Sequence, residues 1–366
     1  MKLLENESRS IDTPQADAGS AIICNVNIRL ASLILLVLKR RKIILRLDGI
    51  NSYPLTRNFL QRRMKFSKIF SNLLIKLASK NKKTYNFVAE SINFLLNFGI
   101  FIRILFSYHL VYQSSFCRDC YAIYFPNKRY NIINNGTLFY GLENVDENVK
   151  KNSYRKILVT FHKNRPLKGT RDVLLFFEQL RQSSDQYNFK VILLGYEPNV
   201  KELDRSGNIF CYDEFLLRNN SWIIPYEKFE DFNDHISSLI WDCDFYISLA
   251  RFDPCPNLML EIMAHGLPVV ACASGGVAEV VGASGILLDV EDGLHKPYFN
   301  YNYDGGVEPP TFYELKQAVD TMLLNFKRYQ NILIKESLER INITNVAHKY
   351  ALATNEVEKD NKCLKS

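Results

Sequence analysis

The chain has 366 residues, of which 47% are hydrophobic and 23% are charged. These values are ordinary for a globular protein and exclude a disordered or fibrous chain, and the length suggests two domains. The formal net charge of +7 is uneven, because residues 1–150 hold 22 Lys or Arg against 10 Asp or Glu, whereas the remainder holds 24 against 29. This asymmetry indicates an anionic partner for the N-terminal part.

Cysteine usage and the chain start point to the cytoplasm. Of eight cysteines only Cys117 and Cys120 are close together, with no second pair and no histidine at ligand spacing. We therefore expect reduced thiols rather than a zinc or redox site. Residues 1–20 are polar and acidic, so they predict a weakly ordered start and show no signal peptide.

The N-terminal domain is expected over residues 21–148. Apolar patterns predict strands at 21–25, 43–47 and 109–114 and a helix at 116–125. The apolar run at 30–38 is too short to span a bilayer, and polar residues interrupt the one at 92–105, which favours a buried or interfacial helix. Asp48 ends a strand and is a candidate for the acceptor side of a site, although an ordinary turn residue fits equally well.

A strongly basic segment lies within this domain. Residues 39–83 contain 14 Lys or Arg and one acid, Asp48, and residues 55–83 predict an amphipathic helix. A core-facing helix explains its apolar stripe but not its charge. We expect this segment to bind an anionic membrane surface. Nucleic acid is the rival partner, but no nucleic-acid-binding motif accompanies the charge.

The second domain begins with a buried strand at 155–161, and a helix follows at 170–182. Lys163 and Lys168 lie at this junction between strand and helix, where two ammonium groups would reach the phosphates of a bound nucleotide. The alternative is a solvated basic loop. Further along, the sequence predicts a strand at 191–195 and a helix at 229–243.

The most informative stretch runs from Ser248 to Glu279. An apolar strand at 244–249 leads into a loop with two prolines, and Asn257 stands at the expected N-cap of a helix. A second buried strand at 267–272 and a helix that opens after Ser274-Gly275-Gly276 complete the pattern. This alternation is typical of a doubly wound parallel sheet with two helix N-termini at one edge, a suitable place for an anion.

Two carboxylates flank that edge. Asp253 lies in the loop and Glu261 one turn into the helix. Carboxylates repel phosphate but accept hydrogen bonds from sugar hydroxyls. Either acid alone fits a solvated surface residue, whereas both together with the Gly-Gly loop favour a sugar site.

These residues carry a family resemblance. The patterns Asp253-x7-Glu261, Gly266-Leu267-Pro268-Val269-Val270 and Gly275-Gly276-x-x-Glu279 resemble the donor site of retaining "group 1" (GT4-like) glycosyltransferases. The resemblance covers residues 154–289 and, more weakly, 21–148. It implies an α/β fold of the GT-B type, with two Rossmann-like domains facing each other across a cleft.

The resemblance also implies a division of the chain. Residues 153–340 would bind the nucleotide-sugar, and residues 341–366 would form a helix that returns to the N-terminal domain. Residues 131–136 resemble the family's last strand of the N-terminal domain. The family's glycine-rich loop after the first strand has no counterpart here, and too few residues precede Ile43 for the usual opening elements, so the N-terminal domain looks shortened or rebuilt.

By resemblance, the chain is expected to be a hexosyltransferase that moves a sugar, with retention, from a nucleotide-sugar to a glycan or lipid-linked acceptor. Cell-surface polysaccharide synthesis at the inner face of the membrane is the expected setting. Glu261 would hold the ribose and Asp253 the transferred sugar, while Lys163 stands where the family has Arg. The expected donor-binding residues are Lys163, Lys168, Asn257, Leu258, Glu261, Gly275 and Gly276; the expected catalytic residues are Asp253, Lys168 and Glu261.

No cofactor or metal is expected, because lysines and helix dipoles would neutralise the leaving phosphates. Two alternatives to the transferase remain. One is a non-catalytic remnant of the fold that binds a nucleotide-sugar, a partner or a membrane, which the missing glycine-rich loop favours. The other, which the Asp253-x7-Glu261 pattern disfavours, is a nucleotide-sugar 2-epimerase.

Overall fold

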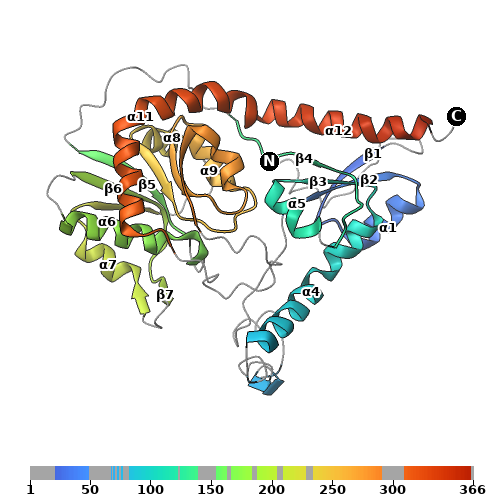
Figure 1. Cartoon of the computed structure of the whole chain (residues 1–366), viewed down its shortest axis with the longest axis horizontal. Helices are drawn as coiled ribbons and strands as arrows, with labels where there is room; N and C mark the ends of the chain where they lie inside the picture. Colours follow the sequence, from blue (N-terminus) through green and yellow to red (C-terminus); the bar gives the residue numbers. More distant parts are fainter. Residues whose placement is uncertain are drawn as a thin grey trace.

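The protein forms two α/β lobes joined by a long C-terminal helical segment in a computed structural model (Figure 1). The basic helix predicted at 55–83 lies almost wholly outside the residues that the structure describes, as do Lys163, the chain start at 1–20 and the linker between the predicted domains. The structure describes residues 21–48, 67, 69–70, 72–73, 76, 82–122, 124–138, 154–162, 166–183, 188–203, 209–227, 234–290 and 309–363.

The N-terminal lobe is built on four parallel strands in the order β1-β2-β3-β4. This order does not reverse within the described part of the lobe, so right-handed crossovers place the connecting helices on one face of the sheet. The strands are β1 (Ala21–Asn25), β2 (Lys42–Leu47), β3 (His109–Tyr112) and β4 (Tyr130–Ile132), and the helices are α1 (Leu30–Leu38), α4 (Lys82–Phe106) and α5 (Ser115–Ala122).

Alternate residues of these strands face different partners. Leu45 packs in the core beneath α1, α4 and α5, whereas its neighbour Ile44 packs against Val346 and Val357 of α12 (Ile343–Cys363). The Lys42 ammonium donates a 3.0 Å hydrogen bond to the Val357 carbonyl. The last helix of the chain therefore covers the second face of the N-terminal sheet, as Figure 1 shows.

The C-terminal lobe holds a six-stranded parallel sheet in the order β9-β6-β5-β10-β11-β12. Counted along the chain this order is 3-2-1-4-5-6, the doubly wound arrangement, and it reverses between β5 and β10. The strands are β5 (Arg155–Thr160), β6 (Phe189–Tyr196), β9 (Ile223–Glu227), β10 (Phe245–Ser248), β11 (Val269–Cys272) and β12 (Gly285–Leu288).

Both faces of this sheet are covered, which is why β10 and β11 are continuous apolar runs with every residue buried. One face packs against α6 (Thr170–Ser183), α7 (Tyr212–Arg218) and the start of α11 (Phe312–Arg340). The other packs against α8 (Asp234–Trp241), α9 (Asn257–Met263) and α10 (Val277–Val281). The remaining elements are β7 (Lys201–Leu203), β8 (Ile209–Cys211) and the short 3-10 turns η3 (Pro166–Lys168) and η4 (Gly282–Ser284).

The doubly wound parallel sheet predicted from the apolar patterns is confirmed. No helix in the described part of the chain is both long enough and apolar enough to cross a membrane.

Candidate functional site

The candidate site lies where the strand order of the C-terminal sheet reverses. Strands β5 and β10 are neighbours, but α6 and α9, the helices that follow them, pack on opposite faces. In sheets of this kind the loops after two such strands diverge, and the crevice between them at the carboxyl ends of the strands is the usual ligand position. Lys168 lies in the loop after β5, and Asp253 lies in the loop after β10.

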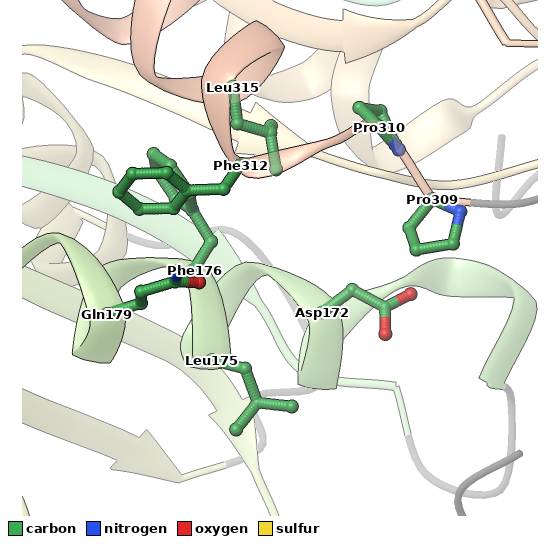
Figure 2. Close-up of a pocket in the computed structure, with 8 residues that line it drawn as sticks. All are labelled: Asp172, Leu175, Phe176, Gln179, Pro309, Pro310, Phe312 and Leu315. Atoms are coloured by element: carbon green, nitrogen blue, oxygen red, sulfur yellow. The ribbon is translucent and has the colours of Figure 1, made fainter.

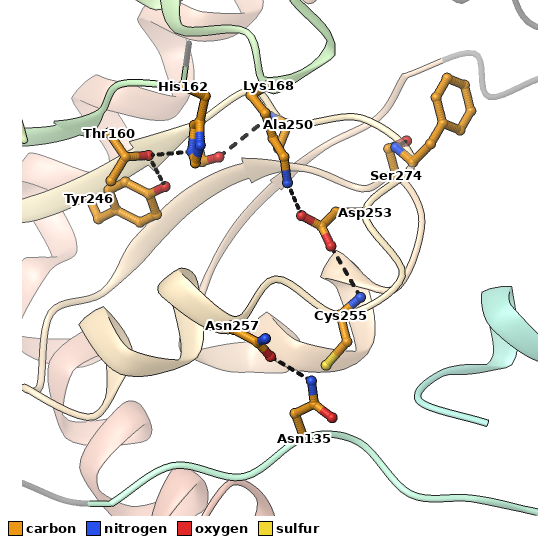
Figure 3. A network of polar contacts seen from close by, with 12 residues as sticks. Asn135, Thr160, His162, Lys168, Tyr246, Ala250, Asp253, Cys255, Asn257 and Ser274 are labelled. Atoms are coloured by element: carbon orange, nitrogen blue, oxygen red, sulfur yellow. Dashed lines mark hydrogen bonds and ion pairs between the residues drawn. The ribbon is translucent and has the colours of Figure 1, made fainter. Parts of the chain in front are cut away.

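Lys168 and Asp253 form an ion pair across this crevice (Figure 3). The exposed fractions of their side chains are only 20% and 11%. The second oxygen of the Asp253 carboxylate, Oδ1, accepts a 3.2 Å hydrogen bond from the Cys255 N–H. Both charges are thus held in fixed positions at the mouth of the crevice.

The Gly-Gly pair holds the Asp253 loop in place. Gly275 has φ +68°, and a Cβ atom there would lie 2.4 Å from the Asp253 carbonyl oxygen. A Cβ atom on Gly276 would lie 2.0 Å from the Pro254 carbonyl oxygen. The Gly276 N–H donates a 2.8 Å hydrogen bond to the Asp253 carbonyl. The Gly276 N–H at this helix N-terminus therefore bonds within the protein and not to an anion. The absence of a Cβ atom at both glycines lets their loop lie against the backbone of Asp253 and Pro254.

Asn257 has a different place from the one predicted. Pro256, with extended backbone angles, is the N-cap of α9, and Asn257 is the first helical residue. The N-cap prediction was wrong, because the fixed φ of proline lets Pro256 make the transition into the helix itself. The Asn257 side chain instead accepts a 2.5 Å hydrogen bond from Asn135 of the N-terminal lobe (Figure 3). Leu258, the next residue, is half-buried in the same turn.

Glu261 lies one turn further along α9 and is half-buried. Burial raises the pKa of its carboxyl above the ordinary value for Glu. Within the described residues the carboxylate makes no hydrogen bond or ion pair, although its backbone carbonyl accepts a 2.7 Å bond from His265 Nδ1. A half-buried carboxylate is suited to accept hydrogen bonds from ligand hydroxyls.

A polar row on the N-terminal lobe faces this site. Asp48 follows β2, and its Oδ1 accepts a 2.6 Å hydrogen bond from Gln113, which follows β3. Burial raises the Asp48 pKa, while the Arg46 charge and the Gln113 bond oppose the rise. Arg46 donates a 2.8 Å bond to the side-chain oxygen of Asn135, which follows β4. The row connects Asp48 through Arg46 and Asn135 to Asn257.

Sequence reasoning singled out Asp48 but missed the functional potential of Arg46, Gln113 and Asn135. The available signal was that polar residues stand at or just after the ends of three consecutive apolar strands. Because the carboxyl ends of parallel strands meet at one sheet edge, such residues lie side by side.

A pocket lies elsewhere in the C-terminal lobe, away from Lys168 and Asp253. This pocket, between α6 and the start of α11, contains none of the predicted site residues; Figure 2 shows its lining side chains, Asp172, Leu175, Phe176, Gln179, Pro309, Pro310, Phe312 and Leu315. No group of three or more His, Cys, Asp or Glu side chains is arranged to hold a metal ion in the described parts of the chain.

Comparison with known proteins gives one family and a set of similar structures. The family model for group 1 glycosyl transferases matches residues 155–296. The chain is similar to HepE from Anabaena in complex with UDP, with a TM-score of 0.55 and 16% identity over 92% of this chain and 79% of that one. Comparison with curated proteins finds no match.

Two further structures are similar. Sucrose-phosphate synthase from Thermosynechococcus elongatus gives a TM-score of 0.53 and 13% identity over 92% of this chain and 73% of that one. A UDP-forming trehalose-phosphate synthase from Burkholderia xenovorans gives 0.56 and 8% identity over 92% and 74%. At these low sequence identities the similarity shows a shared fold and no more.

Proposed function

We propose that this chain, which has the fold of GT-B proteins and whose residues 155–296 match the family model for group 1 glycosyl transferases, transfers a sugar from a nucleotide-sugar donor. The observation that carries the proposal is the pairing of Lys168 with Asp253 at the strand-order reversal, where the Asp253 loop leads into α9, the helix that carries Glu261. The HepE structures, which contain UDP or UDP-glucose, support a donor of the nucleotide-sugar class.

In the proposed reaction, the Lys168 ammonium binds the diphosphate of the donor and the Asp253 carboxylate binds its sugar. The diphosphate would replace Asp253 as the partner of the Lys168 ammonium, because a diphosphate carries more negative charge than one carboxylate. It gains further negative charge as its bond to the sugar breaks. The released Asp253 carboxylate would accept hydrogen bonds from the sugar. Glu261 would hold the ribose, with Asn257, Leu258, Gly275 and Gly276 shaping the site around it. The sugar is transferred with retention, and the positive charge comes from lysines, Lys163 included.

The acceptor would approach from the N-terminal lobe. The Asp48–Gln113 pair faces the C-terminal lobe and offers a carboxylate oxygen and an amide to an acceptor hydroxyl. We propose a glycan or lipid-linked acceptor used in cell-surface polysaccharide synthesis. The protein would work in the cytoplasm and attach to the inner face of the membrane through the basic segment 39–83.

A thermal-shift panel of UDP-, GDP- and ADP-sugars tests this function. A ligand that binds the folded state raises the melting temperature by mass action, and a concentration of about 100 Kd stabilises by roughly 2.7 kcal/mol. We expect one nucleotide class to respond in the wild type and to lose most of its effect in Lys168→Ala. If none of the nucleotide-sugars raises the melting temperature of the wild type, the proposal is contradicted.

A second candidate is a non-catalytic GT-B protein that binds a nucleotide-sugar, a partner or a membrane. The observation that favours it is the strand order of the N-terminal sheet. Within the described residues this order does not reverse, whereas the order in the C-terminal sheet reverses between β5 and β10, where a ligand usually binds. The discriminating measurement is single-turnover consumption of the responding nucleotide-sugar with an acceptor mixture. Binding without consumption supports the second candidate.

A further inference from the structure

The helices of the N-terminal lobe expose an unusual amount of apolar surface. We name it the outer apolar surface; it consists of Leu30, Ile34, Leu35 and Leu38 on α1 and Leu95, Phe98, Leu105 and Phe106 on α4, all exposed. The two helices pack against each other on the same face of the sheet, and Arg103 of α4 donates a 2.8 Å hydrogen bond to the Ile28 carbonyl just before α1. The eight side chains thus come from two helices that cover the same face of the sheet, and Figure 1 shows where α1 and α4 lie in the lobe.

Helix α1 is more apolar than its place in the fold requires. Leu33 is fully buried against the sheet, so this side of the helix accounts for the core contact. Leu30, Ile34 and Leu38 follow one another at intervals of four residues and form a stripe on the exposed side. The exposed fraction of the Leu38 side chain is 74%. A helix that is apolar on all sides is normally buried on all sides.

Helix α4 repeats this arrangement over its last three turns. Phe101 and Ile104 are buried in the core, while Phe98 and Leu105, at an interval of seven residues, share a neighbouring side of the helix and are exposed. The exposed fraction of the Leu105 side chain is 63%. Two neighbouring helices therefore present large aliphatic and aromatic groups to solvent, and contiguous exposed apolar patches mark binding surfaces.

Cations lie at both ends of α1 and near the end of α4. Arg29 precedes α1, and Lys39 and Arg40 follow it; all three are exposed, and residues 21–47 contain no acid. At the end of α4, Lys128 donates hydrogen bonds of 3.1 and 2.6 Å to the carbonyls of Leu105 and Ser107. The rim is positive and the centre apolar, the combination that fits an anionic lipid surface.

We propose that the outer apolar surface is a docking site for a bilayer that contains anionic lipid. The leucines and phenylalanines would enter the boundary between headgroups and acyl chains by roughly 5–10 Å, and the cations would contact lipid phosphates. The inference deepens the proposed function, on which its purpose rests, because it adds the apolar side chains of α1 and α4 to the membrane contact proposed for the basic segment. The surface is formed by α1 and α4 of the N-terminal lobe, whereas Lys168, Asp253 and Glu261 belong to the C-terminal lobe, so we expect docking to leave these three residues accessible.

A bilayer suits this surface better than a second copy of the chain. A twofold interface pairs one patch with itself, so it would bring the rim of Arg29, Lys39 and Arg40 against the same rim of the partner. Like charges at close range repel. An anionic bilayer instead matches both the apolar centre and the positive rim.

Vesicle flotation with the full chain tests the proposal. The test variant is Leu35→Ser/Leu38→Ser on α1; the matched control is Leu217→Ser/Leu324→Ser, which changes two leucines of the C-terminal lobe exposed by 74% and 84%. On vesicles of phosphatidylcholine and phosphatidylglycerol in equal parts, we expect recovery of the test variant to fall at least roughly fivefold, because each leucine removes several buried CH2 groups. The control should float like the wild type.

A charge variant and a donor control complete the experiment. Lys39→Ala/Arg40→Ala should lose recovery on anionic vesicles, and high salt should lower the recovery of the wild type. Melting temperature and thermal-shift response to nucleotide-sugar are measured for every variant, so a failure to dock is distinguishable from a failure to bind donor. Absence of flotation, equal loss in test and control variants, or a dimer that Leu35→Ser/Leu38→Ser dissociates without any flotation would overturn the proposal.

Discussion

The Glu279 carboxylate of the C-terminal lobe accepts a 2.7 Å hydrogen bond from the backbone N–H of Ser115 in the N-terminal lobe. Ser115 is the first residue of α5, and the first N–H groups of a helix have no partner within the helix. The acid also lies at the positive end of that helix. Its second oxygen lies 3.4 Å from the Asn134 side-chain amide. One side chain of the Gly275-Gly276-x-x-Glu279 motif therefore connects the two lobes.

Removing this connection should loosen the start of α5. In Glu279→Ala we expect faster hydrogen exchange at the first amides of α5 and a loss of unfolding free energy of about 1 kcal/mol, the usual effect of removing a helix cap. The control is Glu227→Ala, which changes an exposed glutamate at the end of β9. Equal exchange rates at α5 in wild type and Glu279→Ala would refute a connecting role.

The Lys168–Asp253 pair should behave as a coupled unit. Lys168→Ala leaves a largely buried carboxylate without its cation, and we expect a loss of roughly 1–3 kcal/mol in unfolding free energy. Asp253→Asn in the same chain should restore part of that loss, giving a coupling energy of at least about 0.5 kcal/mol in a double-mutant cycle. Chemical denaturation measures all four proteins. Additive effects would mean that the two side chains do not interact in solution.

The same lysine should discriminate between ligands. Because the ammonium would contact phosphate, Lys168→Ala should weaken binding of the nucleoside diphosphate by roughly 10-fold or more, corresponding to a charge-assisted hydrogen bond of about 1.5–3 kcal/mol. Binding of the nucleoside alone should change little. Calorimetry with both ligands makes the comparison, and an equal loss for both would contradict a phosphate contact.

Two reasons for a glycine at position 275, its positive φ and its close approach to the Asp253 backbone, can be measured separately. Gly275 and Gly195 both have positive φ, +68° and +85°. A Cβ on Gly195 would lie 3.7 Å from its nearest neighbour, the Phe161 carbonyl oxygen, whereas one on Gly275 would lie 2.4 Å from the Asp253 oxygen. Gly195→Ala should cost about 1–2 kcal/mol through φ alone, and Gly275→Ala should cost clearly more. Equal melting temperatures for the two variants would show that the Asp253 loop moves aside without cost.

Glu261 should stabilise the protein less when it is charged. Its pKa is raised by burial in the folded state, so stability is full below the pKa of the unfolded chain and falls as pH rises through the folded value. Glu261→Gln has no such titration. Its melting temperature relative to wild type should rise from about zero near pH 4 to roughly 1–3 °C at neutral pH, while donor affinity falls. A pH-independent difference would assign the effect to packing.

Local patterns were sufficient for much of this protein. Buried parallel strands are continuous apolar runs, so β5, β10 and β11 were predicted close to their observed bounds. The helix pattern after the proline loop predicted α9, and the family resemblance implied a helix where α12 lies. The order of strand, loop and helix also placed Asp253 and Glu261 at one sheet edge, because every strand of a parallel sheet ends there. The fold class and the family resemblance were therefore predictable, whereas the roles of Asp253, Glu261 and Lys168 remain predictions.

The sequence by itself thus determined the strands, the helices and the edge at which the chemistry lies, since these depend on residues that are neighbours along the chain. The tertiary structure alone decided which loops meet: the reversal between β5 and β10 pairs Lys168 with Asp253, and the docking of the lobes joins Ser115 to Glu279. It also decided that one side of α1 stays exposed, because an all-apolar pattern does not say which side meets the core. Contacts between distant segments depend on strand order and lobe packing, and neither is encoded in a local period.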